Sequence, residues 1–164
     1  MALVIESGGV VTGADSFATA AELVTYAENF GKTIPVEVPA QEALLRRAAL
    51  QMDAMPWKGR AVNSDQALAW PRAEVKRQGW VLRLDEIPPQ IKAGQMALAA
   101  EIHADDLVAP ETKTGAVVSE TVGPISTTFA VASKSVSRPA ATRQSYAQFT
   151  GLLESSNQIN LVRS

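Results

Sequence analysis

The chain has 164 residues, 46% of them hydrophobic, and 15 Lys and Arg against 17 Asp and Glu give a formal net charge of −2. This length fits one domain with an appended arm, and the acidity is unlike a protein that binds nucleic acid through a dominant basic face. The sequence has no Cys, which excludes disulfides, thiolate metal sites and Cys nucleophiles. No apolar run approaches the roughly 18 residues that span a bilayer, and the first residues lack the basic region of a signal peptide, so we expect a soluble protein made in the cytoplasm.

The charges form blocks of alternating sign along the chain. The net charge is −5 over residues 1–45, +5 over residues 46–83, −4 over residues 84–114 and +2 over residues 115–164. Such blocks fit a subunit whose positive region meets a negative region on a neighbour. A solvated surface with patchy charge is the alternative.

Two amphipathic helices are predicted in the first third of the chain, after a flexible Gly-rich turn in ESGGVVTG. Thr19 and Glu22 form a capping box at the start of the first helix, and Gly31 is a natural residue to follow its end. Pro39 is tolerated in the first turn of the second helix, and Pro56 ends it. Apolar residues recur at helical spacing in both helices: Leu23, Val24, Ala27 and Phe30 in the first, and Leu44, Leu45, Ala48, Ala49, Met52 and Met55 in the second.

A third helix is predicted from Pro89 to about Leu107, after an irregular or briefly extended segment, RQGWVLRLDEIPPQ. Its buried stripe is expected to contain Ile91, Gly94, Leu98 and Ile102. Gly94 costs a helix roughly 1 kcal/mol relative to Ala, which indicates that another element packs closely there.

The sequence changes character after residue 114. Residues 115–131 are rich in β-branched residues and alternate in polarity after Gly123 and Pro124, which is typical of strands. SYAQFTGLLES predicts a short helix that buries Tyr146, Phe149, Leu152 and Leu153. We therefore expect a mainly α fold, a small helical bundle over residues 1–114 with a β-hairpin or extended C-terminal arm over residues 115–164.

Groups that could support catalysis are sparse. His103 is the sole histidine and lies near the predicted end of a helix, where the helix dipole alone favours it. The Gly-rich segment fits neither phosphate-binding pattern, and adjacent acids such as Asp85 and Glu86 lack a third converging group. We predict no enzyme activity, no cofactor and no metal site.

The connection PWKGRAVNSDQALAWPR, residues 56–72, contains two of the three tryptophans. Their rings fold back over the helices and complete the core in one interpretation. In a second they form an interface hot spot with nearby Lys and Arg, and in a third they stack on nucleobases. The physical argument favours them in that order.

Several segments resemble a family of tailed-bacteriophage proteins. These are ALLRRAALQMDAM, WKGR, NSDQALAWPR and IPPQIKAGQMALAAEI, and the likeness extends from Ser16 to Leu107 with a weaker match in VGPISTTFA and INLVRS. The ending differs slightly, because Ser164 follows Arg163 where the family usually has Gly. Many members are labelled DnaT-like single-stranded-DNA-binding proteins, and structurally the family is similar to head–tail connector, or adaptor, proteins.

The resemblance implies a structural virion protein, a ring of commonly twelve subunits in the phage neck. The ring would bind the portal protein on one side and the next neck or tail protein on the other, with double-stranded DNA passing through its lumen and no membrane involved. A replication-type single-stranded-DNA-binding protein is the alternative function. The candidate interface residues are Trp57, Lys58, Arg60, Trp70, Arg72, Phe129, Tyr146, Phe149, Leu161 and Arg163.

Overall fold

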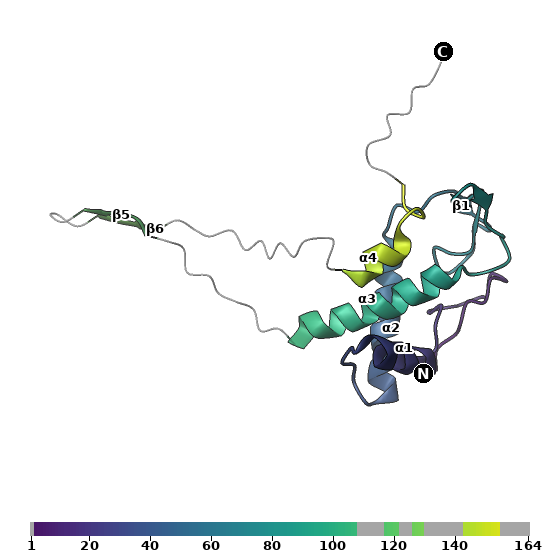
Figure 1. Ribbon diagram of the computed structural model, residues 1–164, viewed down its shortest axis with the longest axis horizontal. Helices are drawn as coiled ribbons and strands as arrows, with labels where there is room; N and C mark the ends of the chain where they lie inside the picture. Colours follow the sequence, from purple (N-terminus) through teal and green to yellow (C-terminus); the bar gives the residue numbers. More distant parts are fainter. Residues whose placement is uncertain (1, 108–116, 122–125, 130–142, 155–164) are drawn as a thin grey trace, which may run out of the picture.

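The computed structural model describes residues 2–107, 117–121, 126–129 and 143–154 (Figure 1). The fold is mainly α with short antiparallel strand pairs, as the sequence predicts. The helices are α1 (Ala20–Phe30), α2 (Val38–Asp53), α3 (Pro89–Leu107) and α4 (Gln144–Phe149). The strands are β1 (Arg60–Ala61), β2 (Arg72–Ala73), β3 (Lys76–Arg77), β4 (Trp80–Val81), β5 (Val117–Thr121) and β6 (Ser126–Phe129), paired β1–β2, β3–β4 and β5–β6.

The first helix has the predicted ends but a slightly different buried face. The Thr19 side chain accepts from the Glu22 amide at 3.2 Å, the Glu22 carboxylate accepts from the Thr19 amide at 2.7 Å, and Gly31 adopts φ 59° after the last turn. Leu23 and Ala27 are buried as predicted. Tyr26 takes the place predicted for Phe30, which is 50% exposed. The Phe30 prediction is wrong because Phe30, in the last turn of α1, stacks on Tyr26 with centroids 4.4 Å apart and stays half-exposed.

The core lies where α2, α3 and α4 pack together. The predicted stripe of α3, Ile91, Gly94, Leu98 and Ile102, is buried, as is the predicted face of α2 except Met55, which is partly buried against the core. A Cβ atom at Gly94 would overlap the aromatic ring of Phe149 on α4. This contact explains the glycine within α3, because any larger residue there would collide with Phe149.

Buried polar side chains attach the N-terminal segment to the helices. The Gln95 carbonyl oxygen accepts from the Phe17 and Ala18 amides at 2.9 and 3.0 Å, and its amide group donates to the Leu45 carbonyl at 2.9 Å. The Glu6 carboxylate, 1% exposed, accepts from the amides of residues 8, 10 and 11. The Gly-rich turn is therefore organised around a buried carboxylate.

Helix α4 belongs to the helical body, although the predicted division places it in the arm. Phe149 and Leu152 are fully buried, and the Lys58 amide donates to the Leu152 carbonyl at 2.9 Å. Tyr146, predicted to be buried with them, is 49% exposed, because a six-residue helix lying on α3 can bury only one face. Within the described residues, the part of the arm that is separate from the body is the β5–β6 hairpin (Figure 1).

Candidate interaction surfaces

The two tryptophans of the 56–72 connection complete the core. Trp57 is 4% exposed and Trp70 is fully buried. Their rings meet edge to face with centroids 5.8 Å apart, and Trp57 makes a second edge-to-face contact with Phe149 at 5.0 Å. The Trp57 indole N–H donates to the Met52 carbonyl at 2.6 Å. No face of these three rings is open to a partner, so the structure gives Trp57, Trp70 and Phe149 a core role in place of the predicted interface role.

The cations of the connection have different surroundings. The Arg72 guanidinium donates to the Lys58 and Gly59 carbonyls at 2.8 and 2.7 Å, and burial lowers the pKa of Arg72. Lys58 donates through Nζ to the Gly151 carbonyl at 2.8 Å. Arg60 pairs with Glu74 at 3.0 Å, and both side chains are largely exposed. Arg72 and Lys58 thus hold backbone in place, and Arg60 is the most accessible of the three.

The remaining predicted interface residues are Tyr146, Phe129, Leu161 and Arg163. Tyr146 is half-exposed on α4. Phe129 is the last residue of β6, whereas Leu161 and Arg163 lie outside the described residues. Their contacts with a partner stay a prediction.

Trp80 is the largest exposed aromatic side chain among the described residues; the sequence names it in support of single-stranded-DNA binding but not among the interface residues. Trp80 is 79% exposed on the β3–β4 hairpin, directly across from Arg77. Gln78 and Gly79 form the two-residue turn with φ 52° and 86°, as type I′ hairpin turns require. The Gln-Gly pair between two short runs is a signal for the hairpin turn, but the exposure of the ring follows from the fold.

We call residues 76–84 the hairpin surface. It contains further exposed side chains in addition to Trp80. Val81 and Leu84 are 64% and 55% exposed. Within the described part of the chain, Lys76 and Arg77 have no acidic side chain at ion-pair distance. The hairpin surface therefore combines apolar area with two cations that the described residues leave uncompensated.

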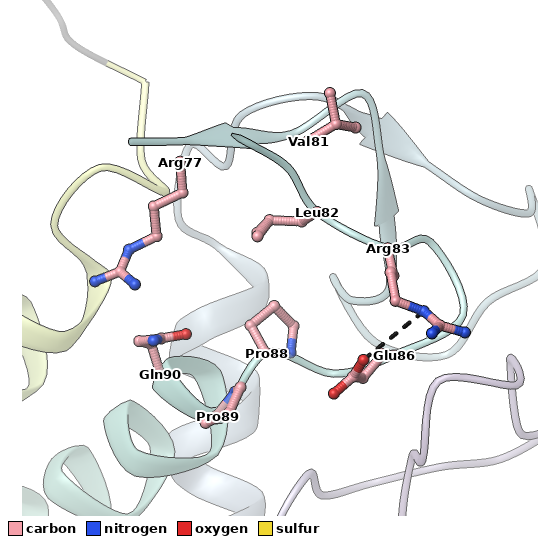
Figure 2. A pocket seen from close by; sticks show the side chains of 8 residues that line it. All are labelled: Arg77, Val81, Leu82, Arg83, Glu86, Pro88, Pro89 and Gln90. Carbon is pink, nitrogen blue, oxygen red and sulfur yellow. Dashed lines mark ion pairs between the residues drawn. The ribbon is translucent and has the colours of Figure 1, made fainter. Parts of the chain in front are cut away.

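A hollow of about 320 Å³ lies beneath this hairpin. Figure 2 shows Arg77 and Arg83 on opposite sides of it, with Leu82 and Pro88 between them. Arg83 is engaged by Asp85 at 2.9 Å and Glu86 at 3.9 Å. Its charge is thus balanced locally, unlike that of Arg77.

A second exposed apolar area surrounds the α1–α2 connection, and we call it the connection surface. Phe30, Val36 and Val38 are 50%, 89% and 54% exposed. The Gln41 side chain donates to the Pro35 and Val36 carbonyls at 2.8 and 3.3 Å and fixes the connection at the start of α2. A hollow of about 480 Å³ lies beside it, and its walls include Val24, Ala27, Glu28, Ile34 and Val36.

Titratable groups are dispersed among the described residues. Over that part of the chain, no three His, Cys, Asp or Glu residues gather as metal ligands. The two resolved pKa increases of acidic groups have structural causes. Burial and the charge of Glu101 raise the pKa of Tyr26, and partial burial raises the pKa of Asp53, against the effect of the Ala69 amide that hydrogen-bonds to it. Nor does any helix in the described ranges have the length and apolarity to cross a membrane.

The fold and its surfaces define a small helical protein with exposed apolar areas and a separate hairpin. A family model described as "Putative DnaT-like ssDNA binding protein" matches residues 1–164, and the chain belongs to this family. No curated protein and no solved structure matches the chain significantly.

Proposed function

We propose that the protein is a structural subunit of a tailed-phage virion, a head-to-tail adaptor that forms a ring between the portal and the next neck or tail protein. DNA passes through the lumen of the ring, and the chain performs no catalysis. The residue patterns that resemble connector proteins support this function. The observation that carries it is the β5–β6 hairpin.

The isolation of the hairpin supports a docking role. Among the described elements, β5 and β6 contact only each other, and they pair antiparallel over Val117–Phe129 to Thr121–Ser126. An isolated two-stranded hairpin is at best marginally stable in water, so a third strand or a packed face must stabilise it. Main-chain hydrogen bonds to an added strand are one such source of affinity.

The hairpin lies in the segment between α3 and α4, and the described residues at the two ends of this segment contact each other on the helical body. Asp105 near the end of α3 pairs with Arg143 at the start of α4 at 3.4 Å. The Glu101 carboxylate also accepts from the Ser145 amide at 3.1 Å and from its hydroxyl at 2.6 Å. The described residues that precede and follow residues 108–142 therefore contact each other on the body.

This geometry allows the hairpin to be removed without removing α4. The variant replaces residues 108–142 with a short Gly-Ser linker and is compared with the full chain for binding to purified portal protein. We expect the far-UV circular dichroism of the helices and their cooperative unfolding to remain, and portal binding to be lost. If the variant that lacks residues 108–142 binds portal protein as well as the full chain does, the docking role is contradicted. A second variant with Thr127→Pro, which removes a backbone donor from β6, controls for the length of the excised segment.

Single-stranded-DNA binding is the second candidate, favoured by the family description and by Trp80 beside Lys76 and Arg77. Oligo-dT titration separates the two functions, because base stacking on Trp80 would quench its fluorescence and the binding would weaken steeply with salt. The adaptor proposal expects no binding at moderate salt. Binding that Trp80→Ala abolishes would favour the second candidate.

A further inference from the structure

The hairpin surface and the connection surface lie at opposite ends of the helical body. Helix α2 begins at Val38, inside the connection surface, and extends for 16 residues, about 24 Å at 1.5 Å per residue. Its far end leads through Trp57 to the strands β1–β4, and Val75 just before β3 is fully buried in the core. Figure 1 shows the α1–α2 connection and the β1 region at opposite ends of the body.

The two surfaces also have opposite uncompensated charges. Glu28 and Glu37 lie in the connection surface, and within the described residues neither forms an ion pair. Lys32 in the same connection reduces the local negative charge by one. Lys76 and Arg77 supply the positive charge at the other end. Each surface contains three large exposed apolar side chains, and their uncompensated charges are opposite in sign.

We propose that the hairpin surface of one copy binds the connection surface of the next copy. Trp80 enters the hollow of about 480 Å³ beside the α1–α2 connection, whose Val24, Ala27 and Ile34 form apolar walls. Arg77, the cross-strand neighbour of Trp80, then faces Glu28 or Glu37. A buried Trp flanked by Arg is the composition that dominates interface hot spots.

Because the two surfaces differ and lie at opposite ends, the contact is head to tail. Such a heterologous interface produces a closed ring when the rotation closes, and an open filament when it does not. This inference rests on the proposed function, for which it names the subunit interface. A nucleic-acid strand fits the hairpin surface less well, because strand-binding grooves stack successive bases and the hairpin surface has a single aromatic ring.

The test mixes two variants, each with one surface disabled. Val36→Asp damages the connection surface and Trp80→Ser damages the hairpin surface; both positions are highly exposed, so the fold should be retained. We expect each variant alone to self-associate about thirtyfold more weakly than the wild type, the size of a hot-spot loss. Sedimentation velocity and light scattering, with portal absent, measure the association.

A mixture of the two variants is the decisive sample. It contains one intact surface of each kind, so it should form heterodimers and nothing larger. The control is Leu50→Asp, at a position on α2 that is 73% exposed and outside both surfaces, which should assemble like the wild type. A wild type that stays monomeric, a mixture that stays monomeric, or either variant assembling normally would overturn the inference.

The outcomes also separate this inference from the proposed function. If the wild type binds portal but the variants assemble normally, the adaptor function stands and the interface assignment is wrong. If the mixture forms heterodimers but the wild type does not bind portal, the interface stands and the adaptor function is wrong. If Trp80→Ser assembles normally but loses oligo-dT binding, Trp80 contacts nucleic acid and the inference is overturned.

Discussion

Trp70 and Trp80 lie ten residues apart and have opposite environments. Trp70 is fully enclosed, with its ring against Trp57 and its backbone next to Ala69, whose amide donates to Asp53 at 2.7 Å. Trp80 is 79% exposed at the turn end of a hairpin with two residues in each strand. The same side chain therefore stabilises the body at one position and is available to a partner at the other.

Local sequence does not distinguish the two rings, because each has an Arg within three residues. Their difference comes from distant partners. Trp57, which packs on Trp70, also contacts Phe149 from α4, and α4 is brought to this point by Gly94 on α3. The comparison teaches that an aromatic residue in a connection is a candidate for an interface only where the fold leaves its ring exposed.

The largest expected effect is the loss of stability from Trp70→Ala. Removing a fully buried aromatic side chain typically costs about 3–5 kcal/mol, from lost burial plus the cavity that remains. Trp80→Ala should change the free energy of unfolding by at most about 0.5 kcal/mol, because its ring is exposed. Urea denaturation followed by circular dichroism measures both. Equal effects of the two substitutions would show that the proposed contrast between the rings is wrong.

A smaller loss is expected from Arg72→Lys. The planar guanidinium donates to two neighbouring carbonyls at once, and an ammonium group cannot reproduce that geometry. We expect a cost of about 2 kcal/mol, within the range for hydrogen bonds from a charged donor. The matched control is Arg60→Lys, whose exposed pair with Glu74 should contribute less than about 1 kcal/mol. If both substitutions cost the same in urea denaturation, Arg72 does not hold the connection.

The sequence predicts the helices well and the surfaces poorly, for a physical reason. Helix ends depend on local signals such as the Thr19 capping box and Pro56, and buried stripes on helical periodicity. The Glu6 carboxylate binds amides only two to five residues away, an arrangement that hydrophobic periodicity does not report. Gly94 indicates a close contact in the sequence, but the identity of its partner, Phe149 on α4, depends on residues distant in the chain. The sequence predicts that Trp57 and Trp70 fold onto the helices, which the structure confirms, although it also names them as interface residues. It does not name Trp80 as an interface residue, because the exposure of Trp80 follows from a hairpin too short to show periodicity.

The smallest expected effect concerns Asp53, whose carboxylate accepts from the Ala69 amide beside Trp70. Partial burial raises the pKa of Asp53 above its ordinary value, so folding favours the protonated acid. The stability from this preference is fully present below the unfolded pKa, about 3.9, and is lost as pH rises through the folded pKa. Asp53→Asn keeps an oxygen for the Ala69 amide and removes the charge. Because the side chain also contacts solvent, we expect a gain below about 1 kcal/mol at pH 7 that shrinks toward pH 4. Urea denaturation at the two pH values tests this, and a gain that grew on acidification would show that the hydrogen bond outweighs the burial.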